Sequence, residues 1–289
     1  HEGYYTLEQI KDVVAYAASK YINVVPEIEM PGHALAALAS YPELSFDSTQ
    51  TYKVSPTWGV FEQVFCPSET TFKFFEGVMD EVVELFPSEY IHIGGDECPK
   101  TAWKNSAFCQ QLIRQLGLKD DVTPSKVDGV KHSKEDKLQS YFVTRMEKYL
   151  NDKGRNIIGW DEILEGGLAP NATVMSWRGV EGGLNAAKAG HNAIMTPMPY
   201  AYLDFYQEDP AIAPTTIGGY TTLKKTYSYN PAPDDADELV KKHVIGMQGN
   251  IWREYMKNSD RTDYQAFPRA MAIAETGWTL DANIMAGRD

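Results

Sequence analysis

Two adjacent carboxylates are the residues of this 289-residue chain that most directly suggest catalysis. Asp96 and Glu97 follow Gly94 and Gly95 at the end of a short apolar segment, residues 90–93. Neighbouring side chains point to opposite faces of a regular strand, but at the turn after a strand both can face one side. Two close negative charges raise the pKa of one carboxyl, which suits it to act as a general acid. The residues alone leave a second interpretation open, in which the pair caps the following helix.

Tryptophans and other charged residues follow further short apolar segments in the same way. They are Glu27 and Glu29, Trp160 with Asp161 and Glu162, Trp177 with Arg178, and Trp252 with Glu254. Aromatic rings with a polar edge suit contact with sugars, although they also fill protein cores. This repeated placement predicts strands whose carboxyl ends carry the functional side chains.

The predicted strands alternate with helices along the chain. We predict six strands, at residues 23–29, 90–93, 156–162, 173–178, 192–196 and 244–252. Such alternation is typical of parallel βαβ units, whose strands are buried on both faces. In a barrel the carboxyl ends of all strands meet at one mouth, whereas an open doubly wound sheet spreads them along an edge. The sequence therefore favours an α/β (β/α)8 TIM barrel, although two strands are missing from the count.

Helix signals frame these strands. Thr6 and Gln9 form a predicted capping box, and apolar residues then recur at helical spacing through Ala17. Further helices are predicted over residues 72–86, 137–153 and 267–278, and loops over residues 120–136, 218–219 and 230–235.

Composition and charge exclude several classes of partner. The net charge of −13 argues against nucleic acid and against an anionic membrane surface, both of which attract basic proteins. No apolar run approaches the roughly 18 residues of a membrane-spanning helix. The three cysteines are too few for a disulfide scaffold and lack the spacing of a zinc site.

Six sequence motifs resemble those of one enzyme family. Residues 92–97 (HIGGDE) are similar to the H-x-G-G-D-E signature of the β-N-acetylhexosaminidases, glycoside hydrolase family 20. The supporting motifs follow in the family's order, at residues 26–33, 159–162, 176–179, 202–204 and 250–254. The resemblance implies an exo-acting enzyme that removes terminal β-linked GlcNAc or GalNAc from glycans, with retention of configuration and without a cofactor or metal.

The resemblance also implies a role for each catalytic residue. Glu97 corresponds to the general acid and base, and Asp96 to the residue that orients the substrate's 2-acetamido group for attack on C1 through an oxazolinium intermediate. Tyr202 corresponds to the tyrosine that donates to the acetamido oxygen. His33 corresponds to the histidine that hydrogen-bonds the general acid.

Five further residues correspond to the family's sugar-binding positions. Trp160, Trp177 and Trp252 match the aromatic wall around the N-acetyl group, and Asp204 and Glu254 match acceptors for the distal hydroxyls. A packed core residue or a solvated loop charge is the alternative for each. Glu29 stands where many family members carry Asp.

The family's catalytic barrel begins with two strands, and a small α/β domain precedes it. The resemblance includes no counterpart of these parts in the chain. We therefore expect residues 1–289 to form about the C-terminal three-quarters of a catalytic domain, with open strand edges beside residues 23–29 and 244–252. Alone, such a chain is expected to be weakly active, or to complete its barrel with a second copy or an N-terminal fragment. A periplasmic or secreted bacterial location is favoured over a lysosomal one, although the cysteines do not fix the compartment.

Two other functions compete with hydrolysis of amino sugars. The first is an inactive barrel that only binds N-acetylated sugars. The second is a metal-dependent hydrolase built on Asp96, Glu97, His33 and His92, although the chain has no HxH or HExxH spacing.

Overall fold

Local capping signals decide where several helices begin. The computed structural model describes residues 3–279. At the start of α1 (Leu7–Ser19) the Thr6 side chain accepts from the Gln9 N–H, and the Gln9 side chain accepts from the Thr6 N–H, which confirms the predicted capping box. Ser133 and Asp136 form the same arrangement at α6 (Lys134–Asp152). That box starts α6 within the segment predicted to be a loop.

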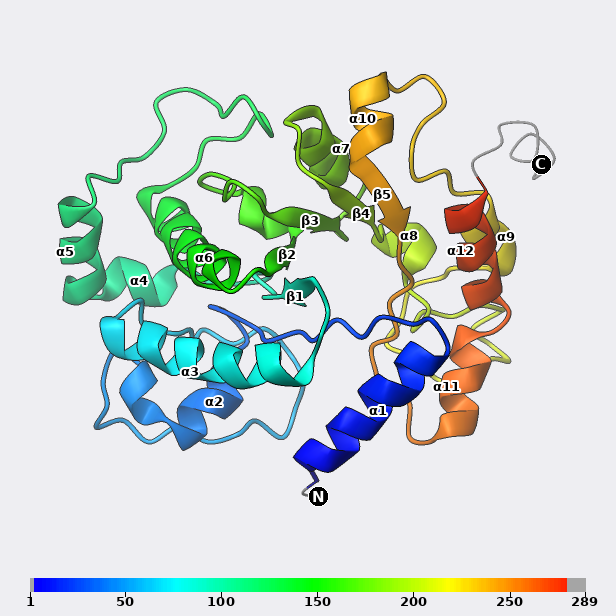
Figure 1. Cartoon of the computed structure of the whole chain (residues 1–289), viewed down its shortest axis with the longest axis horizontal. Coiled ribbons are helices and arrows are strands. Elements are labelled where there is room, and N and C mark those ends of the chain that lie inside the picture. Colours follow the sequence, from blue (N-terminus) through cyan, green and yellow to red (C-terminus); the bar gives the residue numbers. More distant parts are fainter. Residues whose placement is uncertain (1–2, 280–289) are drawn as a thin grey trace. The chain divides into compact units, whose positions relative to one another are not determined.

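The chain divides into two compact units, one ending at Ala172 and one beginning at Thr173. The first unit contains two parallel strands, β1 (Tyr90–His92) and β2 (Asn156–Trp160). Helix α6 packs against β2 and against α3 (Glu69–Leu85) (Figure 1). The other helical segments of this unit are α2 (Leu35–Ser40), η1 (Pro42–Leu44), α4 (Thr101–Asn105), α5 (Ala107–Gln115) and η2 (Asp161–Leu164).

The second unit contains three parallel strands in the order β3 (Thr173–Ser176), β4 (Ala193–Met195) and β5 (Val244–Met247). Helix α7 (Glu181–Lys188) packs against all three strands and against α10 (Glu238–His243) (Figure 1). The remaining helices are α8 (Met198–Ala201), α9 (Leu223–Tyr227), α11 (Ser259–Ala266) and α12 (Arg269–Trp278), of which α9 and α12 pack together. Five of the six predicted strands are thus confirmed, each shorter than predicted.

The predicted strand at residues 23–29 was wrong as a full strand. It is an extended segment joined to β1 by one parallel bridge, between Glu27 and His92. Pro26 has no N–H to donate to a neighbouring strand. It therefore contributes only its carbonyl to the pairing with β1, which accepts a hydrogen bond from the His92 N–H. The segment still carries Glu27 and Glu29 to the end of β1, as the sequence predicts for a neighbouring strand.

Helix α1 forms where expected, but its apolar stripe is not buried. No residue of α1 is buried, and Leu7 and Val13 are 49% and 54% exposed. Capping and periodicity therefore predicted the helix correctly. No segment among the described residues buries its apolar face.

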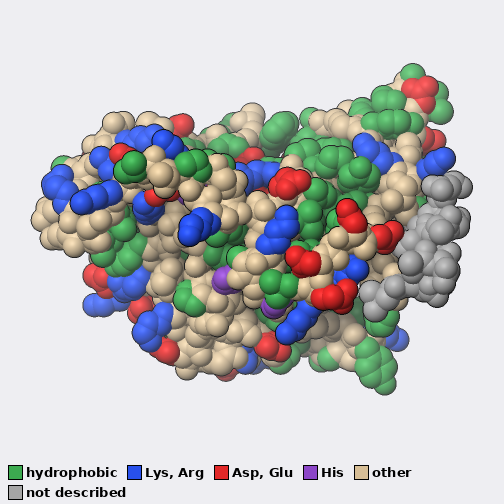
Figure 2. Space-filling model, turned by 90° about the horizontal axis from the view of Figure 1, so that it is seen from above, with side chains coloured by type: hydrophobic (Ala, Val, Ile, Leu, Met, Phe, Trp, Pro, Cys, Tyr) green, Lys and Arg blue, Asp and Glu red, His purple; other side chains and the backbone are tan. Residues whose placement is uncertain are grey.

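Charged side chains on the surface are mixed in sign. Figure 2 shows Lys and Arg side chains interspersed with Asp and Glu side chains over the face that it draws. Residues 3–279 contain no helix that combines the length and the apolar character of a membrane span.

Candidate active site

The turn after β1 brings both predicted catalytic carboxylates against one histidine. His33 Nε2 lies 3.3 Å from Asp96 Oδ2 and 3.4 Å from Glu97 Oε2. Glu97 and His33 both have φ of 45°, in the left-handed region that non-glycine residues rarely adopt. This conformation lets adjacent side chains face the same side, as expected for the turn. Such strained residues cluster at functional sites.

Glu29 lies beneath this turn and explains why Gly94 must be a glycine. Glu29 Oε1 accepts a hydrogen bond from the Gly95 N–H at 2.9 Å. A Cβ on Gly94 would lie 2.0 Å from Glu29 Oε2, and Gly94 has φ of 69°. The carboxyl of Glu29 therefore occupies the space that a side chain at position 94 would need.

Protonation within this cluster differs from the expected carboxylate pair. Hydrogen bonding to Asp96 raises the pKa of His33 despite its burial. Burial raises the pKa of Asp96, but hydrogen bonds from His33 and Glu29 together with the His33 charge outweigh it, so the pKa of Asp96 is lowered. The carboxyl with a strongly raised pKa is Glu29, because it is buried and faces Asp96. At neutral pH the cluster thus holds an ionised Asp96 beside a protonated Glu29.

Glu27 connects the site to Trp160 and His92 within the same unit. The Trp160 indole Nε1–H donates to Glu27 Oε1 at 2.9 Å, and the Trp160 ring lies 4.9 Å from the His92 ring. His92 Nδ1 accepts from the Gly94 N–H at 3.0 Å, and burial lowers the pKa of His92 to about 4. His92 is therefore a neutral ring that supports the turn, and Trp160 is fixed by its polar edge.

In the second unit, Trp177 and Tyr202 form an aromatic pair. Their rings stack with centroids 6.3 Å apart and planes 27° from parallel. Tyr202 makes a parallel bridge to Asn250, and the Leu203 N–H donates to the Asn250 carbonyl at 2.7 Å. The structure thus brings the predicted residues Trp177 and Tyr202 together, on segments that follow β3 and β4.

Asp204 is buried and near a second carboxylate, whereas Trp252 and Glu254 are exposed. Burial, together with the charge of Glu254, raises the pKa of Asp204 to about 7, while Arg269 opposes the rise. Asp204 Oδ1 is buried and has no hydrogen-bond partner among the described residues. Asp204 therefore has a free acceptor atom, and Trp252 is 38% exposed.

Three polar residues that support the site were missed by the sequence reasoning. Gln139 and Lys100 donate to backbone carbonyls on either side of Asp96 and Glu97. Arg269, fully buried, donates to the carbonyls of Leu203 and Phe205, which flank Asp204. For Gln139 the available signal was its place on the apolar face of α6, three and four residues before Phe142 and Val143.

The donor atoms of His33, Asp96 and Glu97 lie within 4.8 Å of one another, close enough to share a metal ion. His92 does not join them, since its Nδ1 faces the Gly94 N–H instead. The four-residue metal site considered from the sequence is therefore not formed as a set.

Comparison with known proteins identifies related sequences over nearly the whole chain. The family model described as glycosyl hydrolase family 20, catalytic domain, matches residues 1–281. A β-hexosaminidase of Porphyromonas gingivalis is 50% identical over 281 residues, which cover 96% of this chain and 34% of that protein. A β-hexosaminidase of Vibrio furnissii is 36% identical over 99% of this chain and 45% of its own length. The chain thus spans a third to a half of the length of these relatives.

Solved structures agree with the sequence comparison. A crystal structure of a β-N-acetylhexosaminidase matches all of this chain and 60% of its own, with a TM-score of 0.82 and 30% identity. A family 20 exo-β-N-acetylglucosaminidase from Vibrio harveyi, in complex with N-acetylglucosamine, matches all of this chain and 44% of its own, with a TM-score of 0.81 and 32% identity. These matches confirm the predicted α/β fold of the TIM-barrel class.

Proposed function

Because the chain belongs to glycoside hydrolase family 20, we propose that it is an exo-β-N-acetylhexosaminidase that releases terminal β-linked GlcNAc or GalNAc from glycans. One observation carries the proposal: Asp96 and Glu97 lie on a single strained turn, and both contact His33 Nε2. The ionised carboxylate, Asp96, lies beside a second carboxyl group, Glu97. This arrangement fits a reaction that needs an anion beside a proton donor.

The proposed mechanism uses the substrate's own acetamido group as the nucleophile. Ionised Asp96 accepts the acetamido N–H and turns the carbonyl oxygen toward C1, and its charge stabilises the oxazolinium ion that forms. Glu97 protonates the departing glycosidic oxygen and then removes a proton from the attacking water. The lowered pKa of Asp96 supports this division of roles, because an anion is needed at that position throughout.

His33 connects the two carboxylates in this scheme. A protonated His33 stabilises the Asp96 anion, which the raised pKa of His33 and the lowered pKa of Asp96 support. The same Nε2 lies 3.4 Å from Glu97 Oε2, so His33 also restricts where the general acid points.

Aromatic residues of each unit are assigned sugar contacts in this proposal. In the first unit this residue is Trp160, fixed by Glu27. In the second unit the residues are Trp177, Tyr202 and Trp252, of which Trp177 and Tyr202 stack together. Tyr202 donates its hydroxyl to the acetamido oxygen. Asp204 and Glu254 accept from the distal hydroxyls, a role that the unpartnered Asp204 Oδ1 supports.

Paired substrates and one variant test the proposal. The chain is expected to hydrolyse an aryl N-acetyl-β-glucosaminide but not the aryl β-glucoside, which carries a 2-hydroxyl and cannot form the oxazolinium ion. Glu97→Gln should lower kcat by about 10²- to 10⁴-fold while the product still binds.

Equal turnover of both substrates would contradict the participation of the acetamide. Binding without turnover by the wild-type chain would favour the sugar-binding barrel, and loss of activity in EDTA would favour a metal-dependent hydrolase.

A further inference from the structure

Two side chains that the mechanism does not use hold the backbone on both sides of the catalytic pair. Gln139, on α6 and 1% exposed, donates from Nε2 to the Gly95 carbonyl at 2.7 Å. Lys100, just before α4, donates from Nζ to the Cys98 carbonyl at 2.8 Å. The two side chains are joined, since Lys100 Nζ also donates to Gln139 Oε1 at 2.6 Å. Asp96 and Glu97 are the two residues between the bound carbonyls.

The turn needs such support because its backbone is unfavourable. Gly94 and Gly95 have φ of 69° and 98°, and Glu97, which has a Cβ, has φ of 45°. A left-handed non-glycine residue costs about 1–2 kcal/mol, so other contacts must select this conformation. If the turn relaxed, the side chains of the adjacent residues Asp96 and Glu97 would return toward opposite faces.

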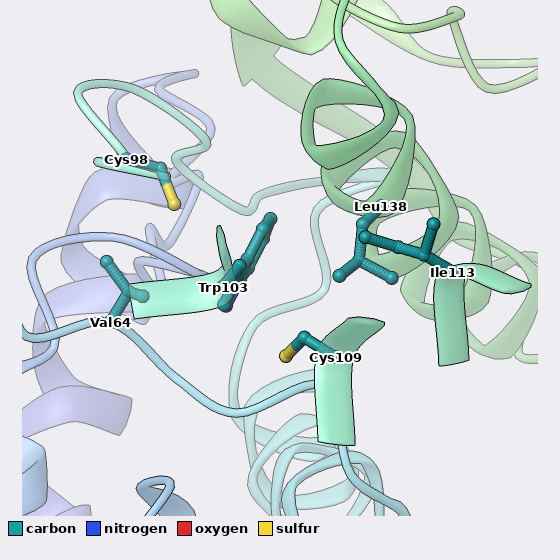
Figure 3. Close-up of a cluster of buried hydrophobic side chains, with 6 residues drawn as sticks. All are labelled: Val64, Cys98, Trp103, Cys109, Ile113 and Leu138. Atoms are coloured by element: carbon teal, nitrogen blue, oxygen red, sulfur yellow. The ribbon is translucent and has the colours of Figure 1, made fainter. Parts of the chain in front are cut away.

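The Gly95 peptide is held at both of its polar groups. Its N–H donates to Glu29, and its carbonyl accepts from Gln139, on segments that lie far from it in the sequence. Cys98, at the end of the turn, belongs to an apolar cluster of buried residues with Val64, Trp103, Cys109, Ile113 and Leu138 (Figure 3). Packing against that cluster restrains Cys98, while Gln139 on α6 and Lys100 just before α4 bind the Gly95 and Cys98 carbonyls.

The contacts of Lys100 indicate that it binds neutral oxygen atoms, one of them a backbone carbonyl, more closely than it binds a carboxylate. Its nearest carboxylate partner, Asp136 Oδ1, lies at 3.8 Å, whereas the two neutral oxygens lie at 2.6 and 2.8 Å. The Lys100 side chain is only 14% exposed, and a cation so placed requires close acceptors. One of these acceptors is a carbonyl of the catalytic turn.

We propose that Lys100 and Gln139 form a positioning clamp, which fixes the Gly95–Cys98 turn so that Asp96 and Glu97 point to the same side. The clamp rests on the proposed function of those two carboxylates. Both clamp residues bind backbone carbonyls of the turn, so we propose that they act through its geometry. A displacement of about 1 Å in a catalytic group can lower a rate by about 10²-fold, which sets the scale of the expected effect.

Gln139→Glu is the sharpest variant. It keeps the size of the side chain and its contact with Lys100, but a carboxylate cannot donate to the Gly95 carbonyl. We expect kcat on an aryl N-acetyl-β-glucosaminide to fall about 10- to 100-fold, with KM changed less than about threefold. Lys100→Met should have a similar effect, and the double variant should be little worse than either single variant because the two residues act as one unit. Lys148→Met, at an exposed lysine of α6, is the matched control and should behave as wild type.

Amide hydrogen exchange tests the clamp without relying on activity. In Gln139→Glu and Lys100→Met, exchange should accelerate in a peptide covering residues 94–99 and stay unchanged in α3 and in β3. If both variants keep wild-type kcat and wild-type exchange, the clamp does not exist. If exchange accelerates but the wild-type chain shows no acetamide-dependent hydrolysis, the clamp is retained and the proposed function fails. Should Lys100→Met not fold, Gln139→Glu decides on both measurements.

Discussion

The His33 side chain contacts both proposed catalytic carboxylates through one nitrogen atom. The ionisation of His33 therefore affects the charge environment of both Asp96 and Glu97. Its pKa is raised by Asp96, and the pKa of Asp96 is lowered in return. A histidine with a raised pKa stabilises the fold below its unfolded pKa, near 6.5, and loses that contribution as pH rises through the folded pKa. The interaction is thus strongest in mildly acidic solution.

Replacing His33 should shift the pH dependence of catalysis. In His33→Asn the cation that holds Asp96 ionised is lost, so the pKa of Asp96 rises and the acid limb of kcat/KM moves to higher pH. The measurement is a pH profile of kcat/KM on an aryl N-acetyl-β-glucosaminide for wild type and variant. An acid limb that stays in place or moves to lower pH would show that His33 does not set the charge of Asp96.

Glu29 offers a test of its own protonation state. A protonated Glu29 accepts from the Gly95 N–H and donates to Asp96, and a glutamine can do both, whereas an alanine can do neither. We expect Glu29→Gln to keep kcat/KM within about tenfold of wild type at neutral pH, and Glu29→Ala to lose about 10²-fold or more. Equal damage in the two variants would indicate that Glu29 acts as an anion.

At the scale of elements, the turn between β1 and α4 depends on the absence of a side chain at Gly94. Gly94→Ala brings a Cβ into contact with Glu29 and strains a left-handed φ, whereas Gly154→Ala, after α6, strains a similar φ of 72° with nothing within 4 Å. We expect both to lose about 1–2 kcal/mol of stability from strain, and Gly94→Ala a further 1–3 kcal/mol together with its activity. Thermal unfolding and kcat measure the two effects. Loss of activity in Gly154→Ala would contradict the local explanation.

The sequence predicted elements better than it predicted their contacts. The capping box at Thr6 located α1, and apolar periodicity located α3, α6 and α12, since those signals lie within a few residues of each other. They could not show that α1 leaves its apolar stripe unburied, because burial depends on segments far away in the sequence. Nor could they show that Gln139 binds the Gly95 carbonyl, since that contact joins residues 44 positions apart.

Across the whole molecule, the motifs supplied the residues proposed for the site but not the contacts that support them. Asp96, Glu97 and His33 come together as predicted, because the HxGGDE turn follows β1 directly. The contact of Glu29 with Gly94 joins positions 65 residues apart, and no local pattern encodes it. Long-range pairing decides such contacts, so the structure was needed to identify the protonated carboxyl.

The net charge of −13 also acts on substrates before they bind. Because this charge repels anions, a GlcNAc sulfated at O6 should approach more slowly than the neutral sugar. We expect kcat/KM for the sulfated aryl glycoside to rise as salt increases from about 0.01 M to about 0.15 M, since the Debye length falls from about 30 to about 8 Å. The value for the neutral glycoside should change less than about twofold. A decrease with salt for the sulfated substrate would mean that cationic residues, rather than the overall charge, govern its approach.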